Sequence, residues 1–474
     1  MGLSFGARHA SVGASGEVLL AVVSTARRHG SAYAGVVTTT AWAEAGRAPS
    51  GAPDCAHMSK PPEQAPKGAH TSGAHTNRHR CLAVTPPGVE EVTAAELAAL
   101  GIGIRRAFRG GVEFTATDRQ LYAANLWLRT ATRVVVRVAR FTAGTFAELE
   151  AQLAAVPWYQ WTAPGTMPVV RVASTASRLY HTDAIAERVV AASGSGPEPG
   201  GLVVVRLVHD RVTVSVDSSG PPLHQRGWRL DGAGAPLRDT LAAAIVLASG
   251  WDRSAPLVDP LCGSGTIAIE AALLAAGRPP GRGRRFAFQD WPTFAPGTWA
   301  SVTATVPADQ ATPPAQEGTP RAAGEERPAT DGAARIVASD RDRPAVAAAR
   351  ANASRAGVAD AVAFSARSLS SVVAAGDAPG WIVTNPPYGK RVGRDPRALY
   401  AQLGEVARHR FEGWTVALLV ADVGAARASG LPLHPQLRTV NGGIPVHLLV
   451  GRVPVRSAYA HGHRRRAGDR RPAP

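Results

Sequence analysis

An Asn-Pro-Pro-Tyr tetrapeptide occupies residues 385–388, directly after the apolar run WIVT. Two prolines fix φ at about −65° and remove two N–H donors, so the turn presents carbonyl oxygens. The side-chain oxygen of Asn385 and the carbonyl of Pro386 can each accept one hydrogen of an NH₂ group, which aims the nitrogen lone pair at an electrophile. The same oxygens stabilise positive charge that develops on the nitrogen. Because Tyr388 adds a ring face for stacking a base, the pattern predicts chemistry on a base amine.

A glycine-rich turn joins an apolar strand to an apolar helix in the stretch LVDPLCGSGTIAIEAALLA. Gly263 and Gly265 allow a sharp turn and close approach of a ligand. The free N–H groups of the helix that begins at Thr266 can bind a carboxylate. Asp259 can accept from a cationic amino group and would repel a pyrophosphate. The turn therefore favours an amino acid zwitterion, and it lacks the spacing of a dinucleotide or phosphate loop.

The next predicted strand ends at Asp340, where an acidic side chain can accept from both hydroxyls of a ribose. Asp342 is expected to face solvent at the start of the following helix. Cys262, within the glycine turn, could serve as a nucleophile, but no histidine lies nearby in the sequence to activate it. Packing of a small residue beside the cofactor is favoured for Cys262. These residues therefore favour a cofactor that has both an amino acid group and a ribose.

The chemistry requires residues 385–388 to share a cleft with Asp259 and Asp340. From about residue 236, predicted helices alternate with short apolar strands, which is typical of a parallel, doubly wound α/β sheet. The helices are expected at 237–249, 266–276, 344–356 and 397–408, and the strands at 256–259, 334–340, 361–364, 381–385 and 414–422.

An α+β module is predicted over residues 80–217. In the strand expected at 133–141, Val134 and Val136 point one way while Arg133 and Arg137 form a basic outer face. The other strands are expected from Cys81 and at 169–172, 202–208 and 212–216, and the helices at 90–100, 118–128, 146–156 and 183–192.

The remaining segments are expected to lack a core of their own. Residues 1–79 are predicted to be a disordered extension, residues 218–236 a linker, and residues 456–474 a basic disordered tail. A disordered insertion is expected at 303–334, within a domain that spans 237–455.

The chain has 52 basic and 36 acidic residues and a formal net charge of +16. This excess favours a polyanionic partner such as nucleic acid, although an arginine-rich composition without a function remains open. Three cysteines without a paired motif indicate a cytoplasmic protein, and no apolar run reaches the ~18 residues of a membrane span. No metal-binding pattern is present, and the oligomeric state is not visible in the sequence.

Several longer stretches resemble one family. They are LHQRGWR (223–229), APLRDTLAAAIVLASGW (235–251), VDPLCGSGT (258–266), FAFQDWPTF (286–294) and TNPPYGKR (384–391). Over residues 81–302 and 335–453 the chain resembles the THUMP-domain guanine-N2 RNA methyltransferases. The resemblance implies a Rossmann-like class I methyltransferase domain that follows a ferredoxin-like and THUMP module for binding RNA.

The resemblance also implies roles for single residues. The methionine end of S-adenosylmethionine would lie at the turn formed by Asp259, Cys262, Gly263, Gly265 and Thr266. Its ribose would lie at Asp340 and its adenine at Ser368, where many relatives have an aspartate. The target guanine would contact Asn385, Pro386 and Tyr388, and RNA or interdomain contacts would fall to Arg226, Trp228 and Arg229.

Three functions follow as hypotheses. The first is methylation of guanine N2 in structured RNA, with rRNA favoured over tRNA. The second is the same chemistry on N6 of DNA adenine or on a protein glutamine amide, which the tetrapeptide alone does not exclude. The third is a noncatalytic RNA-binding protein that keeps the fold.

Overall fold

The computed structural model of the protein describes residues 78–194, 196–229, 237–305, 336–374, 376, 378–388 and 396–455. Residues 1–77 of the expected extension, residues 230–236 of the expected linker and the tail 456–474 lie outside the described residues. So does nearly all of the expected insertion. Within the described residues, no helix combines the length and the apolar character needed to cross a bilayer.

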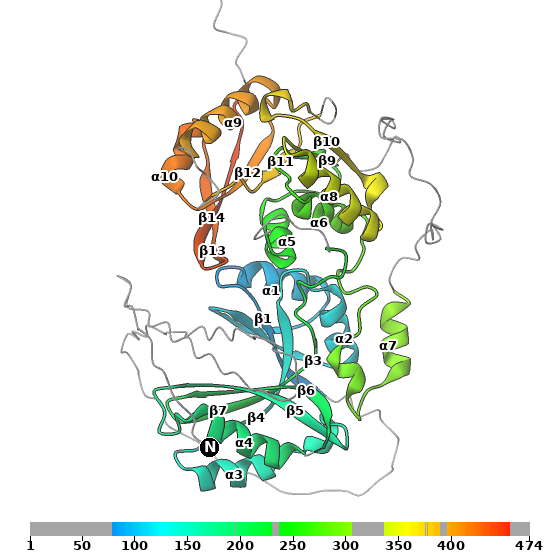
Figure 1. Ribbon diagram of the computed structural model, residues 1–474, viewed down its shortest axis with the longest axis vertical. Helices are drawn as coiled ribbons and strands as arrows, with labels where there is room; N and C mark the ends of the chain where they lie inside the picture. The colour runs from blue at the N-terminus through cyan, green and yellow to red at the C-terminus, as the bar shows by residue number, and fades with distance from the viewer. Residues whose placement is uncertain are drawn as a thin grey trace, which may run out of the picture. The chain divides into compact units, whose positions relative to one another are not determined.

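The described strands form two seven-stranded sheets (Figure 1). The first has the order β2-β3-β1-β4-β7-β6-β5. Its strands are β1 (His79–Val84), β2 (Ile104–Phe108), β3 (Gly111–Ala116), β4 (Arg133–Thr142), β5 (Thr166–Thr175), β6 (Glu198–Val208) and β7 (Arg211–Asp217). Its helices are α1 (Glu90–Ala99), α2 (Asp118–Trp127), α3 (Phe146–Ala154) and α4 (Thr182–Ser193).

One face of this first sheet carries its hydrophobic core. Alternate residues such as Val134, Val136, Val203 and Val205 pack against residues of all four helices in a single cluster. Strands β6 and β7 form an antiparallel hairpin, and His209 and Asp210 between them both have positive φ as a tight turn requires. The opposite face of the sheet is not part of this cluster.

The second sheet has the order β10-β9-β8-β11-β12-β14-β13. Its strands are β8 (Leu257–Asp259), β9 (Ile336–Asp340), β10 (Val362–Ala366), β11 (Trp381–Thr384), β12 (Thr415–Val420), β13 (His434–Asn441) and β14 (Ile444–Arg452). The helices in this part of the chain are α5 (Asp239–Ala248), α6 (Thr266–Ala275), α7 (Pro296–Thr303), α8 (Arg343–Arg355), α9 (Pro396–Arg410) and α10 (Val423–Ala426).

Helices cover both faces of the second sheet, which confirms the doubly wound prediction. Residues of α5, α6 and α8 pack against one face, which includes Leu257 and Val383, and residues of α9 and α10 pack against the other, which includes Val258 and Ile382 (Figure 1).

The predicted parallel sheet has an antiparallel edge. Strands β10, β9, β8, β11 and β12 are parallel, but β14 runs antiparallel to both β12 and β13. Gly442 and Gly443 have positive φ and close a tight hairpin, so the chain returns without a crossover helix.

Two segments pack against elements outside the domain or linker in which they are predicted. Phe286, Phe288, Trp291 and Val302 lie within the expected domain 237–455, yet they belong to the core of the first sheet. The start of the expected linker is packed as well, because Ser218 and Ser219 are fully buried and hydrogen-bonded to Asn125. The burial of the aromatic side chains at 286–291, which chain order does not reveal, places that segment against the first sheet.

Candidate active site

A cleft of about 1140 Å³ lies at the carboxyl ends of three neighbouring parallel strands. Strands β9 and β8 end at Asp340 and Asp259, and Asn385 directly follows β11. Sites in doubly wound sheets occur at this position, where the strand order reverses. The cleft is lined by residues that include Asp259, Cys262, Gly263, Thr266, Asp340, Ser368, Asn385, Pro386 and Tyr388. The structure thus brings the two chemical motifs of the sequence together.

Asp259 is almost completely buried at the floor of the cleft. Its Oδ1 accepts a 2.6 Å hydrogen bond from the Thr384 hydroxyl and a 3.3 Å bond from the Leu261 N–H. Burial raises the pKa of Asp259 to about 7, against the lowering effect of these two bonds and with a smaller raising effect of Asp340. Among the described residues, no donor bonds to its Oδ2, which leaves that oxygen for a ligand.

Asp340 is tied to the glycine turn. Its Oδ2 accepts a 2.9 Å hydrogen bond from the N–H of Gly263, and its Oδ1 accepts a 3.0 Å bond from the N–H of Asp342. Asp342 is exposed and caps α8 by accepting from the N–H of Ala345, as its expected place at a helix start implies. The carboxylate of Asp340 is therefore held in one orientation at the cleft.

The two glycines of the turn differ in what surrounds them. Gly263 has φ +51°, and a Cβ there would have no neighbour within 4 Å, so the cleft stays open above it. Gly265 has φ +85°, and a Cβ there would lie 2.9 Å from Ala349 and 3.1 Å from the ring of Phe364. Gly265 is not among the residues that line the cleft, and its contacts are those of helix packing.

Three further residues from the sequence predictions line the cleft. Burial, together with the charges of Asp259 and Asp340, raises the pKa of the Cys262 thiol well above its usual range, so the thiol stays neutral. Thr266 is buried at the first position of α6. Ser368 is exposed, and its hydroxyl hydrogen-bonds the hydroxyls of Ser370 and Ser371, each at 2.9 Å.

The Asn-Pro-Pro-Tyr corner has an unmatched acceptor. Oδ1 of Asn385 is shielded from solvent and receives no hydrogen bond from the described residues. Such a group is costly to bury unless a donor meets it. Pro386 is buried and Pro387 exposed, so the corner turns at the edge of the cleft. An NH₂ group of a ligand is the kind of donor that this arrangement lacks.

Two contributors to the site were not predicted from the sequence. Nδ2 of Asn441 donates a 2.6 Å hydrogen bond to the Tyr388 hydroxyl, and Asn441, Gly442 and Ile444 of the β13–β14 hairpin line the cleft. Thr384 bonds to Asp259 from the next strand. The Asn-Gly-Gly signal of the hairpin is visible in the sequence, but its place beside Tyr388 depends on the fold.

Arg226 and Trp228 are buried, whereas contacts with RNA would require exposed side chains. Arg226 forms an ion pair with Glu270, with 2.8 Å between Nε and Oε1. Arg229 is mostly buried and contacts Asp239 and Thr266. Arg226 also donates a 2.7 Å hydrogen bond to the carbonyl of Arg129, which lies in the module of the first sheet.

Two family models match the chain. The model of the RMKL-like methyltransferase domain matches residues 226–443, and the model of the RlmL ferredoxin-like domain matches residues 80–135. Ribosomal RNA large subunit methyltransferase K/L of Syntrophotalea carbinolica is 35% identical over 392 residues, 78% of this chain and 53% of that protein. The chain spans about half the length of the K/L relatives that it matches.

A Bacillus subtilis protein named as an RNA methyltransferase, YpsC, is 34% identical over 383 residues, 77% of this chain and 94% of that protein. The crystal structure of SMU.472, described as a methyltransferase and complexed with SAH, superposes with a TM-score of 0.70 at 29% identity. That match covers 80% of this chain and 99% of the other. The extent of these matches, together with the two domain models, shows that the chain belongs to the family of RMKL-like methyltransferases.

Proposed function

We propose that this protein transfers a methyl group from S-adenosylmethionine to the exocyclic N2 amine of a guanosine in structured RNA. The observation that carries the proposal is the buried, unmatched Oδ1 of Asn385, which lines the same cleft as Asp259 and Asp340. This oxygen lacks an N–H donor, and an exocyclic amine supplies one. An amine that binds there lies in the same cleft as the residues suited to the cofactor.

The residues of the cleft fit S-adenosylmethionine. The free Oδ2 of Asp259 suits the ammonium group, and the open space above Gly263 allows the amino acid part to approach the backbone. The oriented carboxylate of Asp340 can accept from ribose hydroxyls. SAH, bound in the SMU.472 structure, is the demethylated form of this cofactor and supports the assignment.

When bound, S-adenosylmethionine supplies an electrophilic methyl group. Asn385 and the Pro386 carbonyl accept the two hydrogens of the target amine and fix the direction of its lone pair. Their oxygens favour the positive charge that forms on the nitrogen. Tyr388, oriented by Asn441, offers its ring to the base that carries the amine. No strong base is required, because the methylated amine is acidic enough to release its proton to water.

An arginine-rich face supports RNA as the partner. The arginines are on the face of the first sheet opposite the helices, as the strand registers place Arg171 beside Val204 and Arg206 beside Thr213. On this face lie Arg80, Arg106, Arg133, Arg137, Arg140, Arg171, Arg206 and Arg211.

Only two arginines of this face have an acidic partner among the described residues. Arg133 pairs with Asp217, and Arg137 pairs with Glu113. The other six are exposed and have no acidic partner within that part of the chain. The predicted basic outer face of the strand at 133–141 is thus neutralised at Arg133 and Arg137, while the remaining arginines of the face carry the excess charge. Such a surface favours a phosphate backbone.

The names of the relatives support RNA over DNA or protein as the substrate, and ribosomal RNA over transfer RNA. A cytoplasmic location, expected from the cysteine content, is part of the same proposal.

The test uses the full chain with methyl-labelled S-adenosylmethionine and, separately, rRNA, tRNA, DNA and a protein with an accessible glutamine. Label in N2-methylguanosine of rRNA is the expected result. Label in N6-methyladenine of DNA or in glutamine would assign a different target to the same cleft. RNA retention without any label would support the noncatalytic hypothesis and overturn the proposal.

A further inference from the structure

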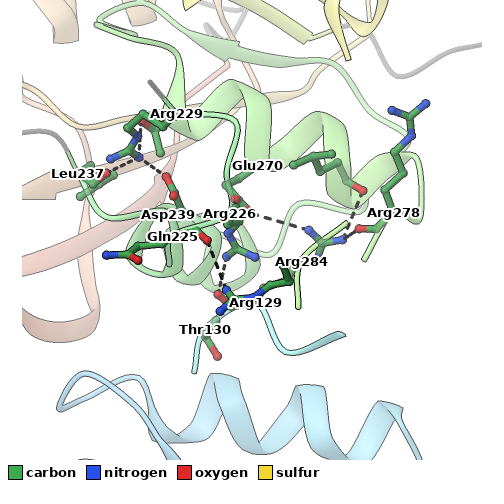
Figure 2. Close-up of polar contacts among 12 residues, drawn as sticks. Arg129, Thr130, Gln225, Arg226, Arg229, Leu237, Asp239, Glu270, Arg278 and Arg284 are labelled. Atoms are coloured by element: carbon green, nitrogen blue, oxygen red, sulfur yellow. Dashed lines mark hydrogen bonds and ion pairs between the residues drawn. The ribbon is translucent and has the colours of Figure 1, made fainter. Parts of the chain in front are cut away.

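Helix α6 is held at its start and middle by two arginines of the segment 223–229 (Figure 2). Nη2 of Arg229 donates a 3.0 Å hydrogen bond to the hydroxyl of Thr266. One turn later, Nε of Arg226 lies 2.8 Å from Oε1 of Glu270. The segment that leaves the first sheet is therefore fixed to the helix that follows the glycine turn.

A third arginine reaches α6 from the loop between α2 and β4. Arg129 follows α2, and its Nη1 lies 3.7 Å from Oε2 of Glu270. Its Nη2 donates to the carbonyl of Leu273 at 3.3 Å and to the carbonyl of Arg278. Its own carbonyl accepts a 2.7 Å hydrogen bond from Arg226. Glu270 is thus the point where contacts from the RNA-binding module and the connecting segment converge.

The ion pairs that Glu270 forms with Arg129 and Arg226 are shielded from solvent. The side chain of Glu270 is 0% exposed, that of Arg226 1% and that of Arg129 5%. Burial lowers the pKa of Arg129 to about 10, although Glu270 raises it in part. Buried ion pairs are a poor source of stability, because desolvation offsets the attraction, whereas apolar residues would pack α6 without directional contacts. The hydrogen bonds of Arg229 to Thr266 and of Arg129 to the Leu273 carbonyl are directional, and with the ion pairs at Glu270 they fix the rotation and the axial position of the helix.

Any movement of α6 would change the cleft. The helix begins at Thr266, which lines the cleft, and the turn before it includes Gly263, whose N–H binds Asp340. A shift of Glu270 along the helix axis would carry Thr266 with it and strain the bond between Gly263 and Asp340. The cluster therefore acts on the cofactor end of the cleft without touching a ligand.

We propose that Glu270 and Arg226 are positioning residues for the cofactor and that, with Arg129, they couple RNA binding on the first sheet to cofactor affinity. The inference rests on the proposed function. Coupling of this kind is reciprocal, so RNA raises the affinity for the cofactor by the factor by which the cofactor raises the affinity for RNA.

The experiment measures SAH binding by calorimetry, with and without an unmodified large-subunit rRNA transcript, for the full chain and for Glu270→Gln. RNA is expected to tighten SAH binding to the wild type by about 5- to 150-fold, the usual range of coupling between sites. In Glu270→Gln this factor should fall towards one, and the KM for S-adenosylmethionine should rise more than kcat falls. If Glu270→Gln fails to fold, Arg226→Lys replaces it, because lysine keeps the charge but lacks the planar guanidinium group. This variant should show the same loss of the RNA effect and the same rise in KM relative to the fall in kcat.

Asp217→Asn is the matched control. Asp217 is also buried and paired with an arginine of the first sheet, but it does not contact α6. This variant should melt at a lower temperature and keep both the SAH affinity and the RNA effect. Equal RNA effects in wild type and Glu270→Gln would overturn the inference. Failure of the wild type to bind SAH would instead refute the proposed function.

Discussion

The hydroxyl of Thr384 donates a 2.6 Å hydrogen bond to Oδ1 of Asp259 and so joins the strand that precedes Asn385 to the floor of the cofactor cleft. Both residues are buried, and their strands are neighbours in the sheet. The bond favours the ionised form of a carboxyl group whose burial favours the neutral form. The protonation of Asp259 is therefore set jointly by the two strands.

Cofactor affinity should depend on pH through Asp259. Its pKa is raised to about 7, so below that pH the carboxyl must release a proton before it can pair with an ammonium group. The affinity for SAH should fall as the pH drops through 7, by a factor that approaches ten per pH unit, and should level off above it. Calorimetry from pH 5.5 to 8.5, in steps of about half a unit, measures this profile. Asp259→Asn should bind weakly with a flat profile, and an unchanged slope in that variant would assign the proton to another group.

Thr384→Val should move that profile to higher pH. The substitution keeps the shape of the side chain but removes the hydroxyl that donates to Asp259. The ionised carboxylate loses a stabilising hydrogen bond, so the pKa of Asp259 rises further. The midpoint of SAH affinity against pH is the readout. Thr439→Val serves as control, because the buried Thr439 hydroxyl has no hydrogen-bond partner among the described residues. A midpoint that stays in place for both variants would contradict the role given to Thr384.

Asn385→Ala should abolish turnover and largely spare cofactor binding. The amide oxygen is proposed to orient the amine and to favour its developing charge, an effect of roughly 10²–10³-fold for one such group in other enzymes. Single-turnover methylation and SAH calorimetry on the same preparation separate chemistry from binding. Methyl transfer at the wild-type rate would remove Asn385 from the reaction.

Tyr388 should act through its ring more than through its hydroxyl. Tyr388→Ala is expected to weaken substrate binding by about 1–3 kcal/mol, the usual contribution of stacking a base, whereas Tyr388→Phe should keep most of the affinity. Because Nδ2 of Asn441 bonds to the hydroxyl, Asn441→Ala should resemble Tyr388→Phe, and the double variant should be no worse. Additive increases in the KM for RNA would show that Asn441 acts independently of Tyr388.

The arginine face should account for much of the salt dependence of RNA binding. Replacing Arg171 and Arg206 with glutamine should lower the slope of log K against log salt by about 0.7–0.9 for each phosphate that the variant no longer neutralises. Filter binding over a series of salt concentrations measures the slope. Arg285→Gln, at an exposed arginine paired with Asp290, should leave it unchanged. If the double variant keeps the wild-type slope, as Arg285→Gln should, the arginine face does not bind the RNA backbone.

Local patterns in the sequence predicted most elements of the second sheet. The strands before Asp259, Asp340 and Asn385 have apolar runs that end at polar residues, and α8 has the apolar spacing of an amphipathic helix. Strands β2, β3, β13 and β14 were not predicted. Their exposed or mixed faces give weak alternation, and β2 in particular is exposed along most of its length.

By itself, the sequence determined the types of residue that meet in the cleft and their order along the chain, because turns of glycine and proline and the ends of strands are local features. Tertiary structure alone decided the partners of those residues. The Thr384 bond to Asp259, the Asn441 bond to Tyr388 and the convergence of Arg129 and Arg226 on Glu270 each join segments that are far apart in the chain. Such contacts depend on which faces become buried together, and the local spacing of residues does not reveal which distant segments meet.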